Sequence, residues 1–256
     1  MSEPTLFVEG PRARIELHRP EKRNRIEPSD LVTLYDIFEQ IDADLEIRTV
    51  VLTASGPVFC SGYHLGALGG ENDREAEPQR QVSFGDACDR LEALRVPTIC
   101  ALNGSVYGGG TDLALACDFR IGIEGSRLGM PAAKIGLQYY SGGLRRYVTR
   151  MSPGAAKRMF LTALPVPADE LLRFGYLDEV VPEDRLEARV DELASAIEAL
   201  APLAIANMKR AINDIANGDP DWGAIDEGAA ATMKSEDHRE GIRALRENRP
   251  PLFHGR

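Results

Sequence analysis

Apolar and polar residues follow two different periods along the first half of this chain. Alternating residues or short apolar runs predict strands, and apolar residues three and four positions apart predict helices. The predicted strands are residues 6–10, 12–17, 48–54, 98–102 and 119–123. The predicted helices are one that follows a Ser29 cap and others at about 82–94 and 110–117. Strands that alternate with helices are typical of a parallel α/β fold.

The pattern changes after Pro182, where only helical periodicity continues. Helices are predicted at residues 183–200, 202–217 and about 221–247, with breaks at Pro202 and at the NGDPDW segment. We therefore expect a separate helical layer at the end of the chain, packed against another subunit.

Composition narrows the functional classes. The 256 residues carry a net charge of -10, which argues against general binding to nucleic acid or to an anionic membrane. No run approaches the roughly 20 apolar residues of a membrane span, and the first residues do not resemble a signal peptide. The four cysteines are widely spaced and the four histidines are isolated, so we expect reduced thiols and no metal site. These features together predict a cytoplasmic protein.

Three consecutive glycines, Gly108–Gly110, stand where a predicted strand leads into a helix. The first N–H groups of a helix lack partners and lie at its positive end, so they can bind a phosphate or an oxyanion. Neither G-x-x-x-x-G-K-[ST] nor G-x-G-x-x-G occurs, which favours an oxyanion on a carbonyl. The alternative explanation of the glycines is that they allow the backbone to pack closely against a neighbouring strand. A second donor is expected near Gly62 and Tyr63, in a loop that follows another apolar strand.

Two other enzyme classes are disfavoured. A nicotinamide-dependent dehydrogenase is expected to carry the G-x-G-x-x-G motif, and a serine hydrolase of the nucleophile-elbow type is expected to carry G-x-S-x-G. The chain contains neither motif.

Four segments together resemble the crotonase (enoyl-CoA hydratase/isomerase) family over nearly the whole chain. They are LHRPEKRNRI (17–26), TVVLTASGPVFCSGYHL (49–65), LNGSVYGGGTDLALACDFRI (102–121) and SEDHREGIRALRENRPPLFHGR (235–256). The resemblance implies a spiral of β-β-α turns over residues 1–182 and a helical trimerisation region over 183–256. It implies an acyl-CoA substrate, coenzyme A as part of that substrate rather than a permanently bound cofactor, and a homotrimer or a dimer of trimers.

The resemblance also implies site residues. The donors to a thioester enolate are the N–H groups of Tyr63 and Gly109, and Asp112 takes the place of a catalytic acid. Ala132 stands where relatives have a second acid, and Tyr140, with Tyr139 beside it, stands where other relatives have theirs. The residues implied for coenzyme A binding are Lys22, Arg23, Arg25, Ser61, Tyr63, His64 and Leu65. Arg19 adds to the positive charge of the same loop.

Hydration or isomerisation of an enoyl thioester is the predicted reaction, although concerted hydration is best served by two carboxylates and this chain offers one. Asp112 alone can move a proton along an acyl chain, with Tyr140 orienting the enolate. Three alternatives stay open: a decarboxylase that uses Tyr139, Tyr140 or His64, a hydrolase of a CoA thioester, and a non-catalytic acyl-CoA binding protein.

Overall fold

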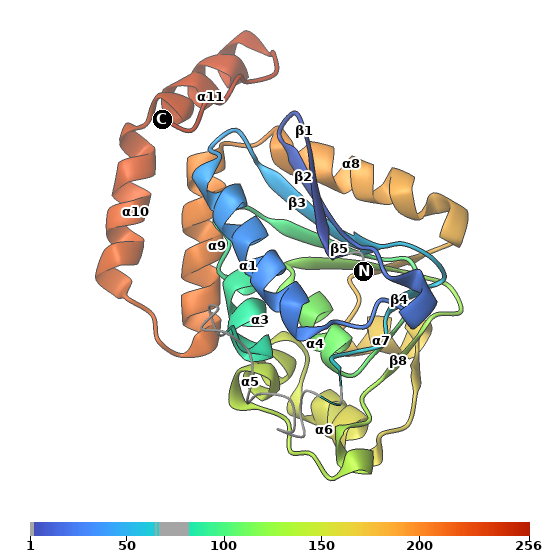
Figure 1. Ribbon diagram of the computed structural model, residues 1–256. Helices are drawn as coiled ribbons and strands as arrows, with labels where there is room; N and C mark the ends of the chain where they lie inside the picture. Colours follow the sequence, from blue (N-terminus) through green and yellow to red (C-terminus); the bar gives the residue numbers. More distant parts are fainter. Residues whose placement is uncertain (1–2, 65, 67–81) are drawn as a thin grey trace.

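The computed structural model describes residues 3–64, 66 and 82–256 (Figure 1). The strands are β1 (Thr5–Glu9), β2 (Arg12–Leu17), β3 (Thr49–Ala54), β4 (Val58–Cys60), β5 (Thr98–Leu102), β6 (Ser105–Tyr107), β7 (Phe119–Ile123), β8 (Arg127–Gly129), β9 (Val166–Pro167) and β10 (Glu179–Val181). The α-helices are α1 (Pro28–Ala43), α3 (Phe84–Glu92), α4 (Gly109–Ala116), α5 (Ser141–Arg150), α6 (Pro153–Thr162), α7 (Ala168–Phe174), α8 (Leu186–Glu198), α9 (Pro202–Asn217), α10 (Trp222–Lys234) and α11 (Glu236–Glu247).

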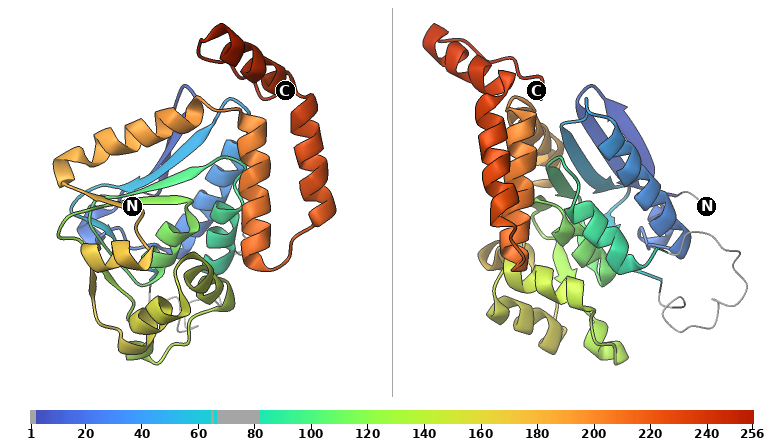
Figure 2. Two further views of the ribbon diagram at one scale, coloured as in Figure 1. Left: turned by 180° about the vertical axis from the view of Figure 1, so that it is seen from behind. Right: turned by 90° about the vertical axis from the view of Figure 1, so that its left-hand side faces the viewer.

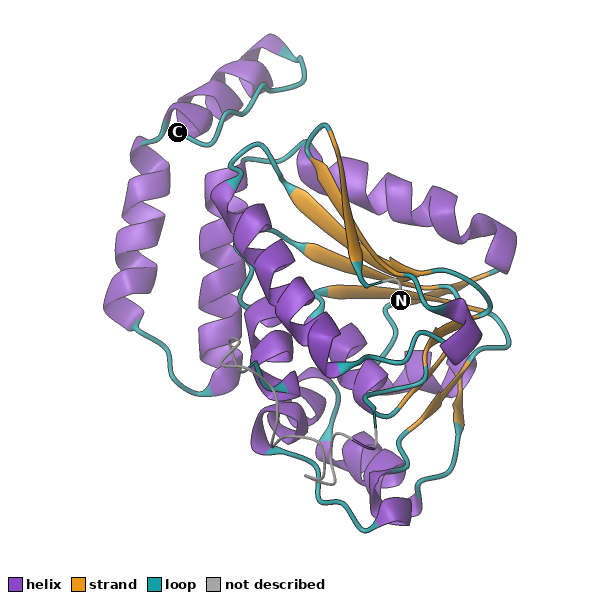
Figure 3. Cartoon of the chain, in the orientation of Figure 1, coloured by secondary structure: helices purple, strands orange, loops and turns teal. Residues whose placement is uncertain are grey.

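The larger sheet has the order β1-β2-β3-β5-β7-β10, with β1 and β2 antiparallel and the remaining pairs parallel. All five predicted strands belong to it, and the α/β class is confirmed. Helices lie against both faces of its central strands (Figure 3). On β3, Val50 and Leu52 join the core that contains α1 and α3, whereas Val51 joins a second core with Leu186 and Val190 of α8. This burial on both faces explains why the strand is continuously apolar.

A smaller sheet, in the order β4-β6-β8-β9, positions the glycine loops. Its strands are two or three residues long and were not predicted. β4 pairs with β6 in parallel, so their carboxyl ends lie at the same edge. The loop that follows β4 and the Gly108 loop that follows β6 therefore start side by side.

Two helix boundaries differ from the predicted ones. Glu27 rather than Ser29 precedes the first turn of α1, because Pro28 occupies the first helical position and the carboxylate of Asp30 accepts a 2.8 Å hydrogen bond from the N–H of Glu27. The segment predicted as one helix at 221–247 is two helices. Ser235 separates α10 from α11, and its hydroxyl accepts a hydrogen bond from the N–H of His238.

The last two helices leave the body of the molecule (Figure 2), whereas α9 packs against it, with Nζ of Lys209 donating to the carbonyl of Val96 at 2.8 Å. α10 runs beside α9, and α11 extends beyond it in an arm that is clear in both views of Figure 2. Large apolar side chains on α9–α11 stay exposed, among them Trp222 (62%), Met233 (69%) and Leu245 (78%). The division at residue 182 and the trimer stay predictions. No described helix is long and apolar enough to cross a bilayer.

Candidate active site

The loops after β4 and β6 meet at two glycines. Gly62 has a φ of +103°, and a Cβ atom on it would lie 3.0 Å from the carbonyl oxygen of Tyr107 and 3.3 Å from the nitrogen of Gly109. A side chain at residue 62 would therefore both strain the backbone and separate the two loops. Gly109 is the first residue of α4, where an N–H group has no carbonyl partner within the helix.

The loop that carries Tyr63 is fixed by backbone hydrogen bonds to the basic loop before α1. The N–H of Ile26 donates to Gly62, that of His64 donates to Ile26, and that of Ser61 donates to Arg23, over 2.8–3.0 Å. The resemblance-based predictions for coenzyme A binding thus fall on two adjoining loops. The side chains of the predicted coenzyme A residues differ in exposure and in whether they are already hydrogen-bonded within the protein.

Lys22 and Arg23 are exposed. Arg25 is half-buried and donates to Glu27, whose other carboxylate oxygen lies 2.9 Å from Nδ1 of His64. The hydroxyl of Ser61 donates to the carbonyl of Lys22. Leu65 lies outside the described residues.

Arg19 does not belong to this positive patch, contrary to the sequence interpretation. Its side chain is 4% exposed and donates to both carboxylate oxygens of Asp30 at 2.6 and 2.9 Å. The apolar periodicity of α1 does not indicate that Asp30 faces inward and pairs with Arg19 of the preceding loop. The sequence therefore did not reveal this ion pair.

Asp112 is fully buried on α4 and is held by Arg146 of α5. Nε of Arg146 donates to Oδ1 at 2.8 Å, and Nη2 donates to Oδ2 at 3.1 Å. The hydroxyl of Tyr140 donates to Oδ2 and accepts from Nη2 of Arg146 at 2.9 Å, whereas the hydroxyl of Tyr139 lies 3.4 Å from Oδ2. Gly143 makes this approach possible, because a Cβ there would lie 2.8 Å from Oδ2 of Asp112.

The structure thus brings the predicted catalytic residues Asp112, Tyr139 and Tyr140 together, but it limits the two tyrosines to donating hydrogen bonds toward the carboxylate. Burial raises the pKa of Tyr139 and of Tyr140 well above the ordinary value of 10.0, and the negative charge of Asp112 adds to the effect. Both phenols therefore stay protonated and act as hydrogen-bond donors rather than bases. Ala132 is buried at the start of a short 3-10 helix, Ala132–Ile135, and brings no carboxylate.

Two residues next to the predicted site escaped the sequence analysis. Arg146 is 0% exposed, and its Nη1 donates to Asp89 at 2.5 Å and to Glu92 at 3.3 Å. Burial opposes its charge, but the hydrogen bonds and the charge of Asp112 raise its pKa above the usual range. Gly143, Arg146 and Tyr147 share the buried face of α5, and an arginine on such a face calls for a carboxylate.

Phe84 is the second residue that was missed. Its ring lies between the candidate oxyanion site and the tyrosines. The ring would be 2.9 Å from a Cβ on Gly109, and its centroid is 5.5 Å from that of Tyr63 and 6.4 Å from that of Tyr140. Phe84 opens α3, directly after a polar segment without periodicity, so no pattern pointed to it.

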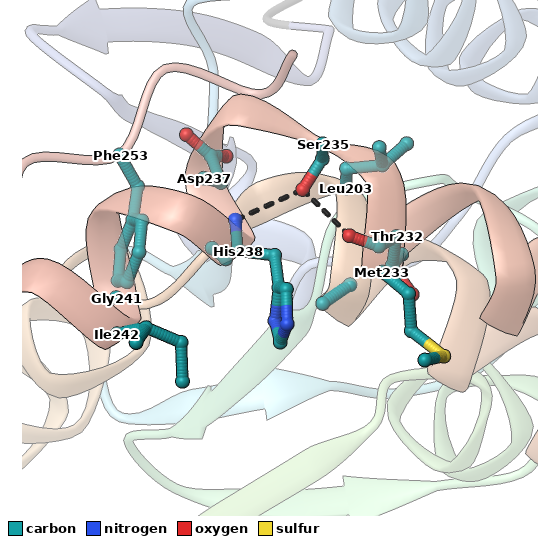
Figure 4. A pocket seen from close by; sticks show the side chains of 11 residues that line it. Leu203, Thr232, Met233, Ser235, Asp237, His238, Gly241, Ile242 and Phe253 are labelled. Carbon is teal, nitrogen blue, oxygen red and sulfur yellow. Dashed lines mark hydrogen bonds between the residues drawn. The ribbon is translucent and has the colours of Figure 1, made fainter.

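A separate pocket of about 280 Å³ lies among α9, α10 and α11 (Figure 4). Its lining residues include Leu203, Met233, His238, Ile242 and Phe253, and none of the predicted site residues that the structure describes lines it. It lies among the apolar side chains that α9–α11 leave exposed, rather than beside Asp112.

Comparison with known proteins decides the family. Residues 11–256 match the family model described as enoyl-CoA hydratase/isomerase. This chain belongs to the enoyl-CoA hydratase/isomerase family. It is therefore an enzyme of that family, and the crotonase resemblance is confirmed.

Individual members of the enoyl-CoA hydratase/isomerase family align over the full length of the chain or nearly so. The carnitinyl-CoA dehydratase of Citrobacter koseri is 33% identical over 266 residues, which cover 100% of both chains. The short-chain-enoyl-CoA hydratase of Clostridium acetobutylicum is 31% identical over 247 residues, 95% of this chain and 94% of the relative. A solved enoyl-CoA hydratase/carnithine racemase from Magnetospirillum magneticum superposes with a TM-score of 0.91 at 29% identity, covering 100% of this chain and 97% of that one. The fold is thus the crotonase fold.

Proposed function

We propose that this enzyme hydrates or isomerises an enoyl-CoA thioester through an enolate whose oxygen accepts hydrogen bonds from the N–H groups of Tyr63 and Gly109. The close approach of Gly62 to the nitrogen of Gly109 carries this proposal, because it places two backbone segments around one small volume at a helix N-terminus. Fixed donors of this kind stabilise negative charge that develops on a carbonyl oxygen, and one donor is worth about 10²–10³ in rate.

Asp112 is the proton carrier in this proposal. In isomerisation its carboxylate takes a proton from C2 of the acyl group, the C–H electron pair enters the conjugated enolate, and the same proton returns at C4. In hydration a water oxygen bonds to C3, the C2=C3 π electrons enter the thioester enolate, and one O–H bond of that water breaks as its proton passes to Asp112. The proton is then returned to C2, which restores the thioester carbonyl. One carboxylate suffices for isomerisation, whereas hydration also needs a positioned water.

The substrate is proposed to be a CoA thioester, bound through the loops at residues 22–25 and 61–64. The exposed Lys22 and Arg23 supply positive charge for its phosphates in an otherwise acidic protein. The names of the relatives support this class, since they act on carnitinyl-CoA and short-chain enoyl-CoA. Coenzyme A then arrives with each substrate, and we propose a trimer or a dimer of trimers as the working assembly.

A second candidate function is decarboxylation or hydrolysis of a CoA thioester. The observation in its favour is that Asp112 already accepts hydrogen bonds from Arg146 and Tyr140, while Ala132 supplies no second acid. Loss of carbon dioxide leaves an enolate without any base, so the same pair of N–H groups would serve it.

The first test is turnover of crotonyl-CoA and of 3-butenoyl-CoA by the wild-type enzyme and by Asp112→Asn. We expect turnover of at least one thioester, and a loss of about 10²-fold or more in the variant. Asp191→Asn is the matched control, because it makes the same change at a carboxylate that is 61% exposed and pairs with Arg12 rather than with Arg146. Release of carbon dioxide from a malonyl-type thioester, lost in Tyr140→Phe, would instead support the decarboxylase.

A further inference from the structure

Arg146 is held by three acids, and the proposed reaction does not itself use it. Arg146 and Asp112 come from different helices, and both side chains are 0% exposed. Arg146 spans the carboxylate with two of its nitrogens, and its third nitrogen is held by Asp89 and Glu92 of α3. The guanidinium therefore has one orientation, set from α3, in which it meets the carboxylate of α4.

The two oxygens of Asp112 are in different surroundings. Oδ1 accepts from Nε of Arg146 at 2.8 Å, which is shorter than the 3.1 Å contact of Nη2 with Oδ2. Oδ2 faces the hydroxyls of Tyr139 and Tyr140. Tyr140 is partly exposed, and its ring is next to Phe84, which contacts Gly109. Oδ2 is thus the oxygen on the side of the candidate enolate site.

We propose that Arg146 is a positioning residue that fixes the plane of the Asp112 carboxylate, through the shorter contact of Nε with Oδ1 and the longer one of Nη2 with Oδ2, so that Oδ2 exchanges the proton with the substrate. This inference rests on the proposed function. In the step, the C2–H bond breaks, its electron pair enters the thioester enolate, and the proton binds Oδ2 as the contact with Tyr140 opens. Arg146 keeps the carboxyl group from rotating during the exchange, and the reverse step returns the proton to carbon.

Buried arginines also stabilise folds, so the neighbouring residue provides the comparison. Arg145 lies on the same helix and pairs with the same acids, at 2.6 Å from Glu92 and 3.6 Å from Asp89, but among the described residues it forms no ion pair with Asp112. A purely structural role of the buried Arg146 predicts a loss of stability, with kcat and hydrogen exchange of the folded protein close to those of the wild type. A positioning role predicts a loss of proton transfer at position 146 alone.

The experiment compares Arg146→Lys and Arg146→Gln with Arg145→Gln. Three quantities are measured: kcat and KM for the best enoyl-CoA, exchange of the C2 hydrogen of a saturated acyl-CoA with deuterium oxide, and the Kd of that acyl-CoA. Lysine cannot reproduce the two-point contact, and small misplacement of a reacting group costs up to about 10²-fold. We expect kcat and exchange to fall at least about tenfold in both Arg146 variants, with KM and Kd within about threefold of the wild type.

Arg145→Gln is expected to keep kcat and exchange within about threefold of the wild type. Equal losses at positions 145 and 146, or unchanged exchange in Arg146→Lys, would overturn the positioning role while leaving the proposed function intact. Where Arg146→Gln does not fold, the folded Arg146→Lys variant decides. A wild-type enzyme that neither exchanges nor turns over any thioester overturns the proposed function, and the positioning role with it.

Discussion

Replacing Gly109 by alanine tests the candidate oxyanion site with one methyl group. The new Cβ would lie 2.9, 3.2 and 3.3 Å from three ring atoms of Phe84. The ring is the outer end of a partly buried side chain and can move, and Gly109 has helical backbone in which alanine is favoured. We therefore expect the free energy of unfolding to change by no more than about 1 kcal/mol.

Activity should respond far more strongly than stability. The methyl group and the displaced ring occupy the space from which an enolate oxygen would approach the N–H of Gly109. Loss of one such donor costs about 10²–10³ in kcat, which corresponds to about 2.7–4 kcal/mol. The assay is steady-state turnover of the best enoyl-CoA, combined with urea unfolding of the same preparation.

Gly110→Ala is the matched control. Its Cβ would lie 2.6 Å from both Cβ and Sγ of Cys60, inside the core and not beside Phe84. Such overpacking costs about 1–3 kcal/mol of stability, and we expect the folded fraction to lose less activity than Gly109→Ala does. If Gly109→Ala keeps kcat/KM within about threefold of the wild type, the oxyanion interpretation of these glycines is wrong.

Four further predictions concern stability, reactivity and assembly. Arg19→Met should cost about 3–5 kcal/mol in urea unfolding, because it leaves the carboxylate of Asp30 buried without its partner, and a loss under about 1 kcal/mol would contradict this. The hydrogen bond from Arg14 lowers the pKa of Glu187 below its ordinary 4.5. The resulting stabilisation is present above about pH 4.5 and is lost as the pH falls through the lower pKa of the folded state. The difference in free energy of unfolding between the wild type and Glu187→Gln should therefore shrink over that range, and a constant difference would refute the prediction. Burial raises the pKa of Cys60 to about 12, so iodoacetamide at pH 8 should modify it only after unfolding, as mass spectrometry of the intact protein can show. Light scattering should give the mass of three or six chains, because α9–α11 expose large apolar side chains, and a strict monomer would count against that assembly.

Much of the fold could be predicted because the larger sheet leaves a clear signal. β3 and β5 are buried on both faces, and the four turns of α1 repeat an apolar face. β4, β6 and β8 have three residues each, too few to show any period, so the smaller sheet was missed. The break at Ser235 did carry a signal, since a serine followed by Glu236 and Asp237 is a typical helix start.

The part of the candidate site that depends on backbone conformation could be predicted from the sequence. The part that depends on contacts between side chains far apart in the sequence could not. Glycines at a strand-to-helix turn predict a close approach to the N–H of Gly109, and its role as a donor to an oxyanion stays a prediction. The partner of Asp112 could not be named in the same way, because Arg146 lies 34 residues further on, beside another arginine. Only the packing of α4 against α5 shows which of the two faces inward.

The most direct test of the account is mass spectrometry of a broad panel of acyl-CoA thioesters incubated with the wild-type enzyme in deuterium oxide. The proposed chemistry predicts that at least one enoyl-CoA gains a water or an isotopic label in its acyl chain, while coenzyme A stays attached. A panel that binds but emerges unchanged, or that yields only carbon dioxide or free coenzyme A, would contradict it.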